Sequence, residues 1–259
     1  MRPTKVGASG NRPYRWLARY YDLLFTPQRS WGEKARRKLL AKILPNVSSA
    51  CDLACGTGTA AVELAGQCVK VYAVDRSPAM CELARRKARR AGLPVRVIQA
   101  DMRTFRLPEQ VDLVTCEFDA INHVPTKAHL ARVLESVARA LRPGGYFYFD
   151  VNNLLSFEKG WQARWWTERP GVVLLMSGGY DRAREKAFAD AEWFVRSGRS
   201  WRRFHEHIEE VCWSATEMRD ALRTAGFSRV RAWDAAPFFP EDPHIRRGYR
   251  TFYLARKLG

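Results

Sequence analysis

Long apolar runs and paired cysteines are missing from this sequence of 259 residues. No stretch reaches the length of about 18 apolar residues that a membrane helix needs, so no membrane span is predicted. Residues 1–13 are polar and no apolar segment of a secretory signal follows them. The six cysteines form no CxxC pair, which indicates reduced thiols and no metal site. These absences predict a cytoplasmic location.

Acidic residues are also scarce. The chain has 27 Asp and Glu against 44 Lys and Arg, a formal net charge of +17. Residues 1–50 hold 11 basic and 2 acidic side chains, and residues 1–13 are predicted to form a disordered basic tail. A solvated arm and helix explain this excess, but clustered arginine also favours an anionic partner such as RNA. Both interpretations stay open at this point.

What the chain does have is a composition suited to a buried core, with 46% hydrophobic and 12% aromatic residues. Residues 14–25 and about 30–44 show helical spacing, with Arg36 among the basic residues placed off the apolar face, and Pro45 is expected to end the second helix. Short apolar runs then alternate with helical patterns, which predicts βαβ units and a mostly parallel sheet. The runs are 47–54, 69–75, 95–101, 111–118 and 145–152.

From about residue 160 to 213 this alternation breaks down. Residues 172–180, 186–198 and 200–213 predict three antiparallel strands, with turns at Gly178-Gly179 and Ser197-Gly198. A capping box from Ser214 to Glu217 then opens a helix, and strands at 227–234 and 249–257 follow. The sequence therefore predicts a doubly wound, seven-stranded, Rossmann-like α/β domain (14–155 with 214–259) and an antiparallel β insertion (156–213) that forms a lid.

The strongest chemical signal follows the first predicted strand and has the sequence Asp52-Leu53-Ala54-Cys55-Gly56-Thr57-Gly58. Glycines at a turn between a strand and a helix let the backbone approach a ligand closely. About twenty residues later, Asp75 ends the second strand, where a carboxylate can accept both hydroxyls of a ribose. Asp101 ends the third strand before Met102, a pairing suited to an exocyclic amine and a flat base. The carboxyl ends of these strands thus predict a nucleoside site.

Two cofactor classes place a ribose carboxylate after the second strand. A dinucleotide enzyme favours a third glycine in the loop, where this chain has Ala61, but alanine is tolerated there. Asp52 is more informative, because a carboxylate would repel a pyrophosphate and would suit the ammonium group of an amino-acid moiety. S-adenosylmethionine therefore fits better than NAD.

Several segments together resemble the class I S-adenosylmethionine-dependent methyltransferases over residues 14–155: DLACGTG, AVDRSPAM, QADMRTF, CEFDAINHV and ARALRPGGYFYFDVN. The YYD of residues 20–22 and the segment EEVCWSATEMRDALRTAGF are similar to the branch acting on small molecules, which includes sugar-amine N,N-dimethyltransferases and uncharacterised bacterial proteins. The resemblance implies that residues 52–58 hold the methionine moiety, Asp75 the ribose, and Asp101 with Met102 the adenine. It adds Arg76 to the cofactor site, and Glu117 and Phe118 to the methyl-transfer site.

Two side chains are candidates for catalysis. Sugar-amine relatives carry a histidine at the place of His123, which implies a base or a substrate-positioning residue there, with a structural loop residue as the alternative. The phenol of Tyr21 could orient either reactant, with core packing as the alternative. The sequence thus predicts in-line methyl transfer to nitrogen or oxygen of a small molecule, with an anionic acceptor and a homodimer both left open. An RNA methyltransferase and a non-catalytic binding protein are the alternatives, and nucleic acid is disfavoured because no binding module is recognisable.

Overall fold

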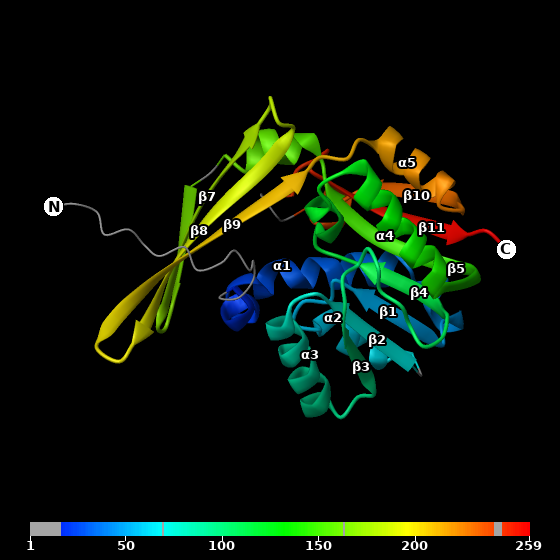
Figure 1. The fold of residues 1–259 in the computed structure, drawn as a ribbon, viewed down its shortest axis with the longest axis horizontal. Coiled ribbons are helices and arrows are strands. Elements are labelled where there is room, and N and C mark those ends of the chain that lie inside the picture. The colour runs from blue at the N-terminus through cyan, green and yellow to red at the C-terminus, as the bar shows by residue number, and fades with distance from the viewer. Residues whose placement is uncertain (1–16, 69, 163, 241–244) are drawn as a thin grey trace.

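The structure is a computed structural model that describes residues 17–68, 70–162, 164–240 and 245–259, and at Leu17 and residues 25–31 it describes the backbone alone. The predicted tail of residues 1–13 lies outside these ranges. Two sheets organise the chain: a large one in the core and a smaller one that projects from it (Figure 1).

The core sheet contains seven strands among the described residues and confirms the predicted Rossmann-like fold. In spatial order they are β10 (Phe227–Asp234), β11 (Arg250–Lys257), β5 (Leu141–Asn152), β4 (Val111–Cys116), β1 (Ser49–Leu53), β2 (Lys70–Asp75) and β3 (Val95–Gln99). The pairs from β3 to β5 are parallel, whereas β11 pairs with β5 and with β10 in antiparallel fashion. Each strand overlaps the apolar run predicted for it.

Helices cover both faces of this sheet. The α-helices of the described residues are α1 (Leu17–Leu39), α2 (Thr59–Ala65), α3 (Pro78–Ala91), α4 (Lys127–Ala140) and α5 (Ala215–Thr224). Side chains of α4 and α5 pack on one face, and those of α1 and α2 pack on the other, with α3 beside α2. The predicted capping box from Ser214 to Glu217 is present at the start of α5, and Gly92 ends α3 in the left-handed conformation.

The N-terminal segment differs from the two helices predicted for it. One helix, α1, runs without a break from Leu17 to Leu39, and Pro45 lies beyond it in the short helix η1 (Leu44–Asn46). Each half of α1 is held by burial in a different place: Leu24 packs into the smaller sheet and Ala35 into the core. Tertiary packing at both ends therefore overrides the local signal that Pro27 gives against helix.

Residues 156–213 contain the predicted antiparallel sheet, but with four strands in the described part rather than three. The strands are β6 (Arg164–Arg169), β7 (Val172–Asp181), β8 (Lys186–Ser197) and β9 (Ser200–Val211). Sequence alternation missed β6 because its side chains are mostly exposed on both faces. The turn predicted at Ser197-Gly198 is confirmed, since Gly198 has a φ of 63° between β8 and β9.

The turn predicted at Gly178-Gly179 is wrong, because both glycines lie inside β7 and pair with β8. A Cβ at Gly178 would lie 2.6 Å from the backbone oxygen of Trp161, and one at Gly179 would lie 2.9 Å from the ring of Phe188. These glycines therefore permit close approach of neighbouring groups, which is the other common reason for glycine in a strand.

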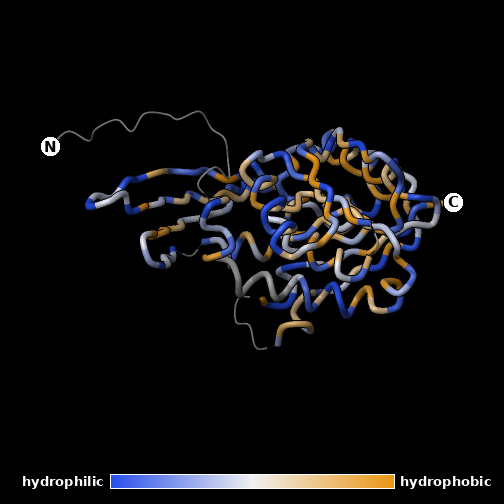
Figure 2. The backbone as a smooth tube through the Cα atoms, turned by 90° about the horizontal axis from the view of Figure 1, so that it is seen from below, coloured by the Kyte–Doolittle hydropathy of each residue, from blue (hydrophilic) through white to orange (hydrophobic). Residues whose placement is uncertain are grey.

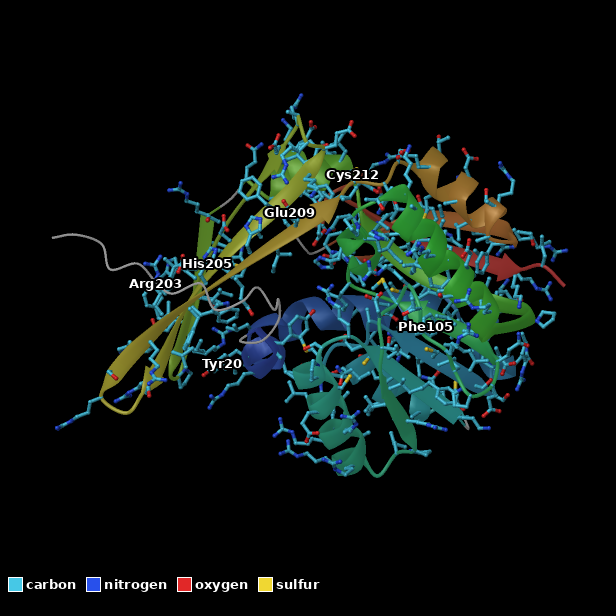
Figure 3. All side chains as sticks on the ribbon, viewed as in Figure 1. Tyr20, Phe105, Arg203, His205, Glu209 and Cys212 are labelled. Carbon is cyan, nitrogen blue, oxygen red and sulfur yellow. The ribbon has the colours of Figure 1, made fainter. Side chains whose placement is uncertain are left out.

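The smaller sheet packs on the first half of α1. Alternate residues of β8 are buried, and Trp193 among them stacks on the ring of Tyr20 at a centroid distance of 6.2 Å. The far end of the sheet, where β8 turns into β9, is hydrophilic (Figure 2). Strand β9 runs from Arg203 through His205 and Glu209 toward Cys212, where the chain re-enters the core (Figure 3).

All six cysteines are free thiols, as predicted. No helix built from the described residues is long and apolar enough to cross a membrane. The cytoplasmic location itself stays a prediction.

Candidate active site

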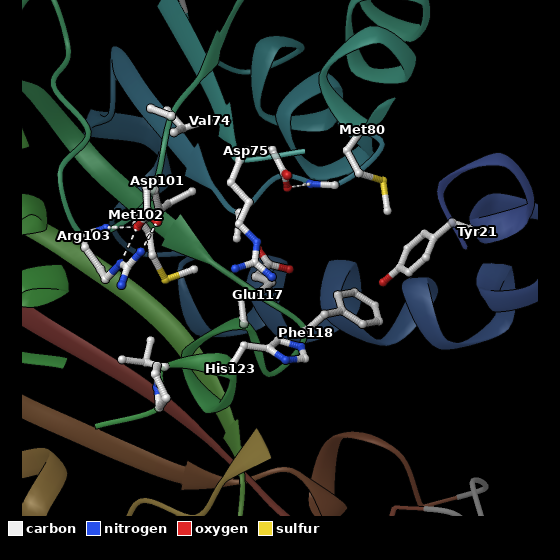
Figure 4. A pocket seen from close by; sticks show the side chains of 18 residues that line it. Tyr21, Val74, Asp75, Met80, Asp101, Met102, Arg103, Glu117, Phe118 and His123 are labelled. Atoms are coloured by element: carbon white, nitrogen blue, oxygen red, sulfur yellow. Dashed lines mark hydrogen bonds and ion pairs between the residues drawn. The ribbon is translucent and has the colours of Figure 1, made fainter. Parts of the chain in front are cut away.

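A cavity of about 250 Å³ lies where the carboxyl ends of β1, β2 and β4 meet (Figure 4), the edge at which such sheets bind ligands. The predicted site residues that line it are Tyr21, Ala54, Gly56, Asp75, Arg76, Asp101, Met102, Glu117, Phe118 and His123. A smaller cavity of about 60 Å³ adjoins it and is lined by the predicted residues Asp52, Cys55 and Thr57. No described residue of the smaller sheet lines either cavity, so the lid role stays a prediction.

The two glycines of the loop after β1 serve different purposes. Gly56 has a φ of 53° and nothing within 4 Å of where its Cβ would stand, so it leaves open space at the cavity wall. Gly58 has a φ of 80°, and its Cβ would lie 2.9 Å from the Cα of Ala84 in α3. Gly56 thus fits the predicted approach to a ligand, whereas Gly58 permits close packing of α2 on α3 and lines neither cavity.

Asp75 ends β2 and organises the backbone around the cavity. Its Oδ2 accepts a hydrogen bond from the Gly56 amide at 2.9 Å, and its Oδ1 accepts one from the Ser77 amide at 2.8 Å. Burial raises the pKa of this carboxyl, and the same two amides oppose the rise. Asp75 therefore fixes both the loop after β1 and the start of α3, while the side chain faces the cavity (Figure 4).

Asp101 is held by Arg103, which the sequence did not predict as a site residue. Arg103 donates from Nε to Oδ1 at 2.9 Å and from Nη2 to Oδ2 at 2.6 Å, and its backbone amide also donates to Oδ1. Hydrogen bonding by the Arg103 side chain holds the pKa of Asp101 below its ordinary value. A carboxylate has further lone pairs, so Asp101 still offers an acceptor to the cavity.

A buried ionic cluster forms the floor between the two cavities. The guanidinium of Arg36, 4% exposed, donates to both oxygens of Glu117 at 2.6 and 2.7 Å and pairs with Glu63. Gly32 makes room for this arrangement, because a Cβ there would lie 2.8 Å from Glu117 Oε2. The sequence placed Arg36 on a polar helix face, so the cluster corrects that expectation.

Asp52 lies beside this ionic cluster and has one carboxylate oxygen without a well-aligned hydrogen bond within the described part of the chain. Its Oδ1 accepts a hydrogen bond from Thr115 at 3.2 Å, but its buried Oδ2 has no well-aligned partner among the described residues, although the Ala61 amide is near. Burial first, and then the charge of Glu117, raise the pKa of Asp52 to about 7. The site therefore presents a buried carboxylate oxygen that can accept a further hydrogen bond.

The YYD segment of α1 joins the helix to the cofactor loop. Tyr21 lines both cavities, and the next residue, Asp22, accepts a hydrogen bond from Thr57 Oγ1 at 2.5 Å. Lys87 of α3 pairs with Asp22 at 2.7 Å and also donates to Thr57 at 3.0 Å. These contacts fix α1, which carries Tyr21, across the loop after β1.

The turn after β4 is strained and is held by β5. Phe118 and Asp119 adopt left-handed backbone conformations in succession, with φ of 60° and 50°, although neither is glycine. Their amides donate to the two oxygens of Asp150 at 2.8 and 3.1 Å, and Arg250 pairs with Asp119 at 2.8 Å and with Asp150. Asp150 thus has a structural role at the strand end and places Phe118 at the cavity wall.

His123 is the last residue of the short helix η2 (Ala120–His123) and faces the cavity (Figure 4). Its Nδ1 lies 3.3 Å from the Glu209 carbonyl of β9, and its Nε2 lies 3.7 Å from Glu210 Oε1. Burial lowers the pKa of His123 below its ordinary value, while Asp119 opposes the shift. This shift favours the neutral ring, which is the form that accepts a proton.

Comparisons with known proteins show which families and folds the chain is similar to. Residues 50–145 match the family model described as a methyltransferase domain. The protein named "Putative methyltransferase YqeM" of Bacillus subtilis (strain 168) is 27% identical over 94% of this chain and 97% of its own. A dTDP-3-amino-3,6-dideoxy-alpha-D-glucopyranose N,N-dimethyltransferase of Streptomyces fradiae is 27% identical over 85% of this chain and 87% of its own.

Among solved structures, an S-adenosylmethionine-dependent methyltransferase from Clostridium acetobutylicum ATCC 824 shares the fold. Its TM-score is 0.77 at 23% identity, over 95% of this chain and 99% of that one. Residues 50–145 therefore match a methyltransferase domain within a Rossmann-like fold, and S-adenosylmethionine is the cofactor that this match supports.

The residues present fit this cofactor. A cavity with carboxylates at the ends of β2 and β3 suits ribose and adenine, and the buried Oδ2 of Asp52 is an acceptor that an ammonium group can satisfy. The side chain of Met102 lies beside Asp101 in the cavity (Figure 4), where it can contact a flat base.

Proposed function

We propose that this protein is an S-adenosylmethionine-dependent methyltransferase that transfers a methyl group to a nitrogen or oxygen atom of a small-molecule acceptor, with His123 as the base. The observation that carries the proposal is a half-buried histidine at the wall of the cavity, whose surroundings lower its pKa. Tyr21 faces the same cavity from α1 and positions the reactants. Such a reaction requires reactants held in line in a dry pocket, and the buried floor of Arg36 and Glu117 supplies that setting.

The same geometry supports a set of proposed cofactor contacts. The loop from Asp52 to Gly58 holds the methionine moiety, with the ammonium on Asp52, and Asp75 and Arg76 hold the ribose. Asp101 and Met102 hold the adenine. Bound S-adenosylmethionine supplies a methyl group on a sulfonium, whose carbon–sulfur bond breaks as the acceptor lone pair forms the new bond. His123 Nε2 receives the proton that the acceptor gives up.

An amino sugar is the first acceptor class to test, because the Streptomyces fradiae relative is named for one. That name also includes a nucleotide diphosphate, which would be the anionic part of such an acceptor. The charge of the exposed Arg76 at the cavity, which is also a proposed cofactor residue, attracts such a negative group. The smaller sheet then bounds the acceptor side, since β9 contacts η2 next to His123.

Release of S-adenosylhomocysteine across a panel of amines, hydroxyl compounds and carboxylates tests the proposal. With the best acceptor, His123→Ala is expected to lower turnover roughly 100-fold or more, the contribution of a general base. Calorimetry should find cofactor affinity near that of the unmodified protein. His205→Ala is the matched control, because His205 lies on the outward face of β9, bonded to Glu192.

Two outcomes would contradict this function. Unchanged turnover in His123→Ala would reduce His123 to a structural residue. Strong binding of unspecific RNA that weakens steeply with salt, together with methyl transfer to RNA, would favour the alternative of an RNA methyltransferase.

Cofactor affinity is expected to rise with pH between about 5 and 7, by up to roughly tenfold per pH unit. The reason is that Asp52, with a pKa of about 7, is protonated in the unliganded protein at low pH and must ionise to pair with the ammonium group. Calorimetry at pH 6 in buffers of different ionisation enthalpy should detect about one proton released per cofactor bound. In Asp52→Asn both the slope and the proton release should disappear, and their persistence would assign them to another group.

A further inference from the structure

A buried ionisable cluster lies where the smaller sheet meets the core, and it includes residues outside both cavities. Glu210, 2% exposed, enters it from β9, one residue beyond the Glu209 labelled in Figure 3. Asp119 and His123 enter from the turn after β4 and from η2, and Arg250 enters from β11. One carboxylate oxygen each of Asp119 and Glu210 and one ring nitrogen of His123 all lie within 4.8 Å of one another.

The cluster is built on a rigid frame. Asn122, fully buried, donates to the carbonyls of Asn152 at 3.0 Å and Val211 at 2.9 Å, and accepts from the Asn152 amide at 2.9 Å. Asn152 Nδ2 in turn donates to Glu210 Oε2 at 3.2 Å. The segment around Asn122 therefore ties the end of β9 to the end of β5 immediately beside His123.

The geometry around His123 selects one tautomer. The Glu209 carbonyl can only accept a hydrogen bond, so the proton of the neutral ring sits on Nδ1, which lies 3.3 Å away. Nε2 is then the basic nitrogen, and Glu210 Oε1 lies 3.7 Å from it. That separation exceeds hydrogen-bond distance but suits an attraction to the protonated ring.

Asp119 and Glu210 bring carboxylate oxygens within 4.8 Å of each other at a buried site, where two adjacent negative charges are disfavoured and one shared proton is favoured. Asp119 also pairs with Arg250 at 2.8 Å, so the ionised form belongs to Asp119. Burial and the charge of Asp119 raise the pKa of Glu210 well above its ordinary value. The pair thus carries one negative charge, which Arg250 partly balances.

We propose that Glu210 of the inserted sheet is a positioning residue for His123, sharing one proton with Asp119 so that the pair presents a single negative charge to the ring. The Glu209 carbonyl fixes the tautomer, and the pair stabilises the imidazolium that forms when Nε2 takes the acceptor's proton. The groups facing the ring are the Asp119–Glu210 pair, Asp150 and Arg250 behind it, and Arg76 across the cavity. The inference rests on the proposed role of His123 as the base.

Nuclear magnetic resonance of the ¹⁵N-labelled full-length protein tests this without any acceptor. The chain has five histidines, and the signals lost in His123→Asn identify those of His123. We expect an Nδ1–H tautomer and a pKa below the usual value of about 6.5. In Glu210→Gln, whose amide imitates the protonated acid, the tautomer should persist and the pKa should stay within about 0.3 unit. Glu209→Gln is the matched control, because its side chain pairs with Lys186 and Arg184 on the outward face.

Three results would overturn the proposal. A fall of about 1 unit or more in the pKa of His123 in Glu210→Gln would show that Glu210 carries a charge of its own. An Nε2–H tautomer in the unmodified protein would remove the positioning role. A change in the His123 signals on adding zinc or a chelator would show that a metal ion, and not a shared proton, lies between Asp119 and Glu210.

Turnover separates this inference from the proposed function. Once an acceptor is known, Glu210→Ala should lower kcat about tenfold or more with little change in KM, and Glu210→Gln should restore it together with the acidic limb of the pH profile. If no acceptor is methylated but the resonance data agree, the proposed function fails and the Glu210–Asp119 arrangement stands. If turnover depends on His123 but not on Glu210, the proposed function stands and the positioning role of Glu210 fails.

Discussion

Asp75→Ala is expected to weaken binding of S-adenosylmethionine by roughly a hundredfold or more. The carboxylate is proposed to accept two ribose hydroxyls, and hydrogen bonds to a charged group contribute about 1.5–3 kcal/mol each. The same carboxylate holds the amides of Gly56 and Ser77, so its loss also releases the loop that frames the cavity. Isothermal titration calorimetry of the purified variant measures the effect directly.

Asp112→Ala is the matched control for this experiment. Asp112 also accepts backbone hydrogen bonds, from Ser48 at 3.0 Å and Ser49 at 2.9 Å, but it does so at the opposite edge of the sheet, where β1 begins. It should lose stability while cofactor affinity stays near normal. Retained micromolar binding in Asp75→Ala would refute the ribose assignment.

The core of the fold could be predicted because each of its strands is a short apolar run between helix signals. The strand at Phe227–Asp234 and the helix start at Ser214 agree residue for residue, since the capping box is a local device. Prediction from local sequence failed where tertiary packing determines the secondary structure. The segment through Pro27 is helical because Leu24 and Ala35 are buried in different clusters, and β6 is exposed on both faces and shows no alternation.

The cavity residues at strand ends were predictable for a similar reason: in a parallel sheet the carboxyl ends of the strands meet at one edge. Their partners were not. Arg36 reaches Glu117 across 81 residues, and Arg250 reaches Asp119 across 131, distances at which spacing carries no signal. Asp22 and Arg103 stood beside predicted residues, so adjacency to Tyr21 and to Asp101 was the available hint.

Arg36→Met is expected to lower the free energy of unfolding by about 3–5 kcal/mol, the usual cost of leaving a buried partner charge unpaired. Arg36 is the cation that faces Glu117, Glu63 and Asp52, and methionine keeps the bulk of its aliphatic stem without the charge. Burial opposes its charge, yet Glu117 raises the pKa of Arg36 above its ordinary value, so the guanidinium is charged throughout the accessible pH range. Urea denaturation followed by circular dichroism measures the loss.

Arg37→Met provides the comparison, because the adjacent Arg37 is exposed and its pair with Glu33 is an i,i+4 surface contact worth about 0.3–0.5 kcal/mol. If Arg36→Met lowers the free energy of unfolding by less than about 1 kcal/mol, the carboxylates that face Arg36 become protonated at little cost in stability. The double variant Arg36→Met/Glu117→Gln should regain part of the stability, since it removes the facing charge. The double variant could regain stability without regaining cofactor affinity. That result would show that the cluster shapes the cofactor site as well as the core, because Asp52 would have to ionise without the nearby guanidinium, which lowers its pKa.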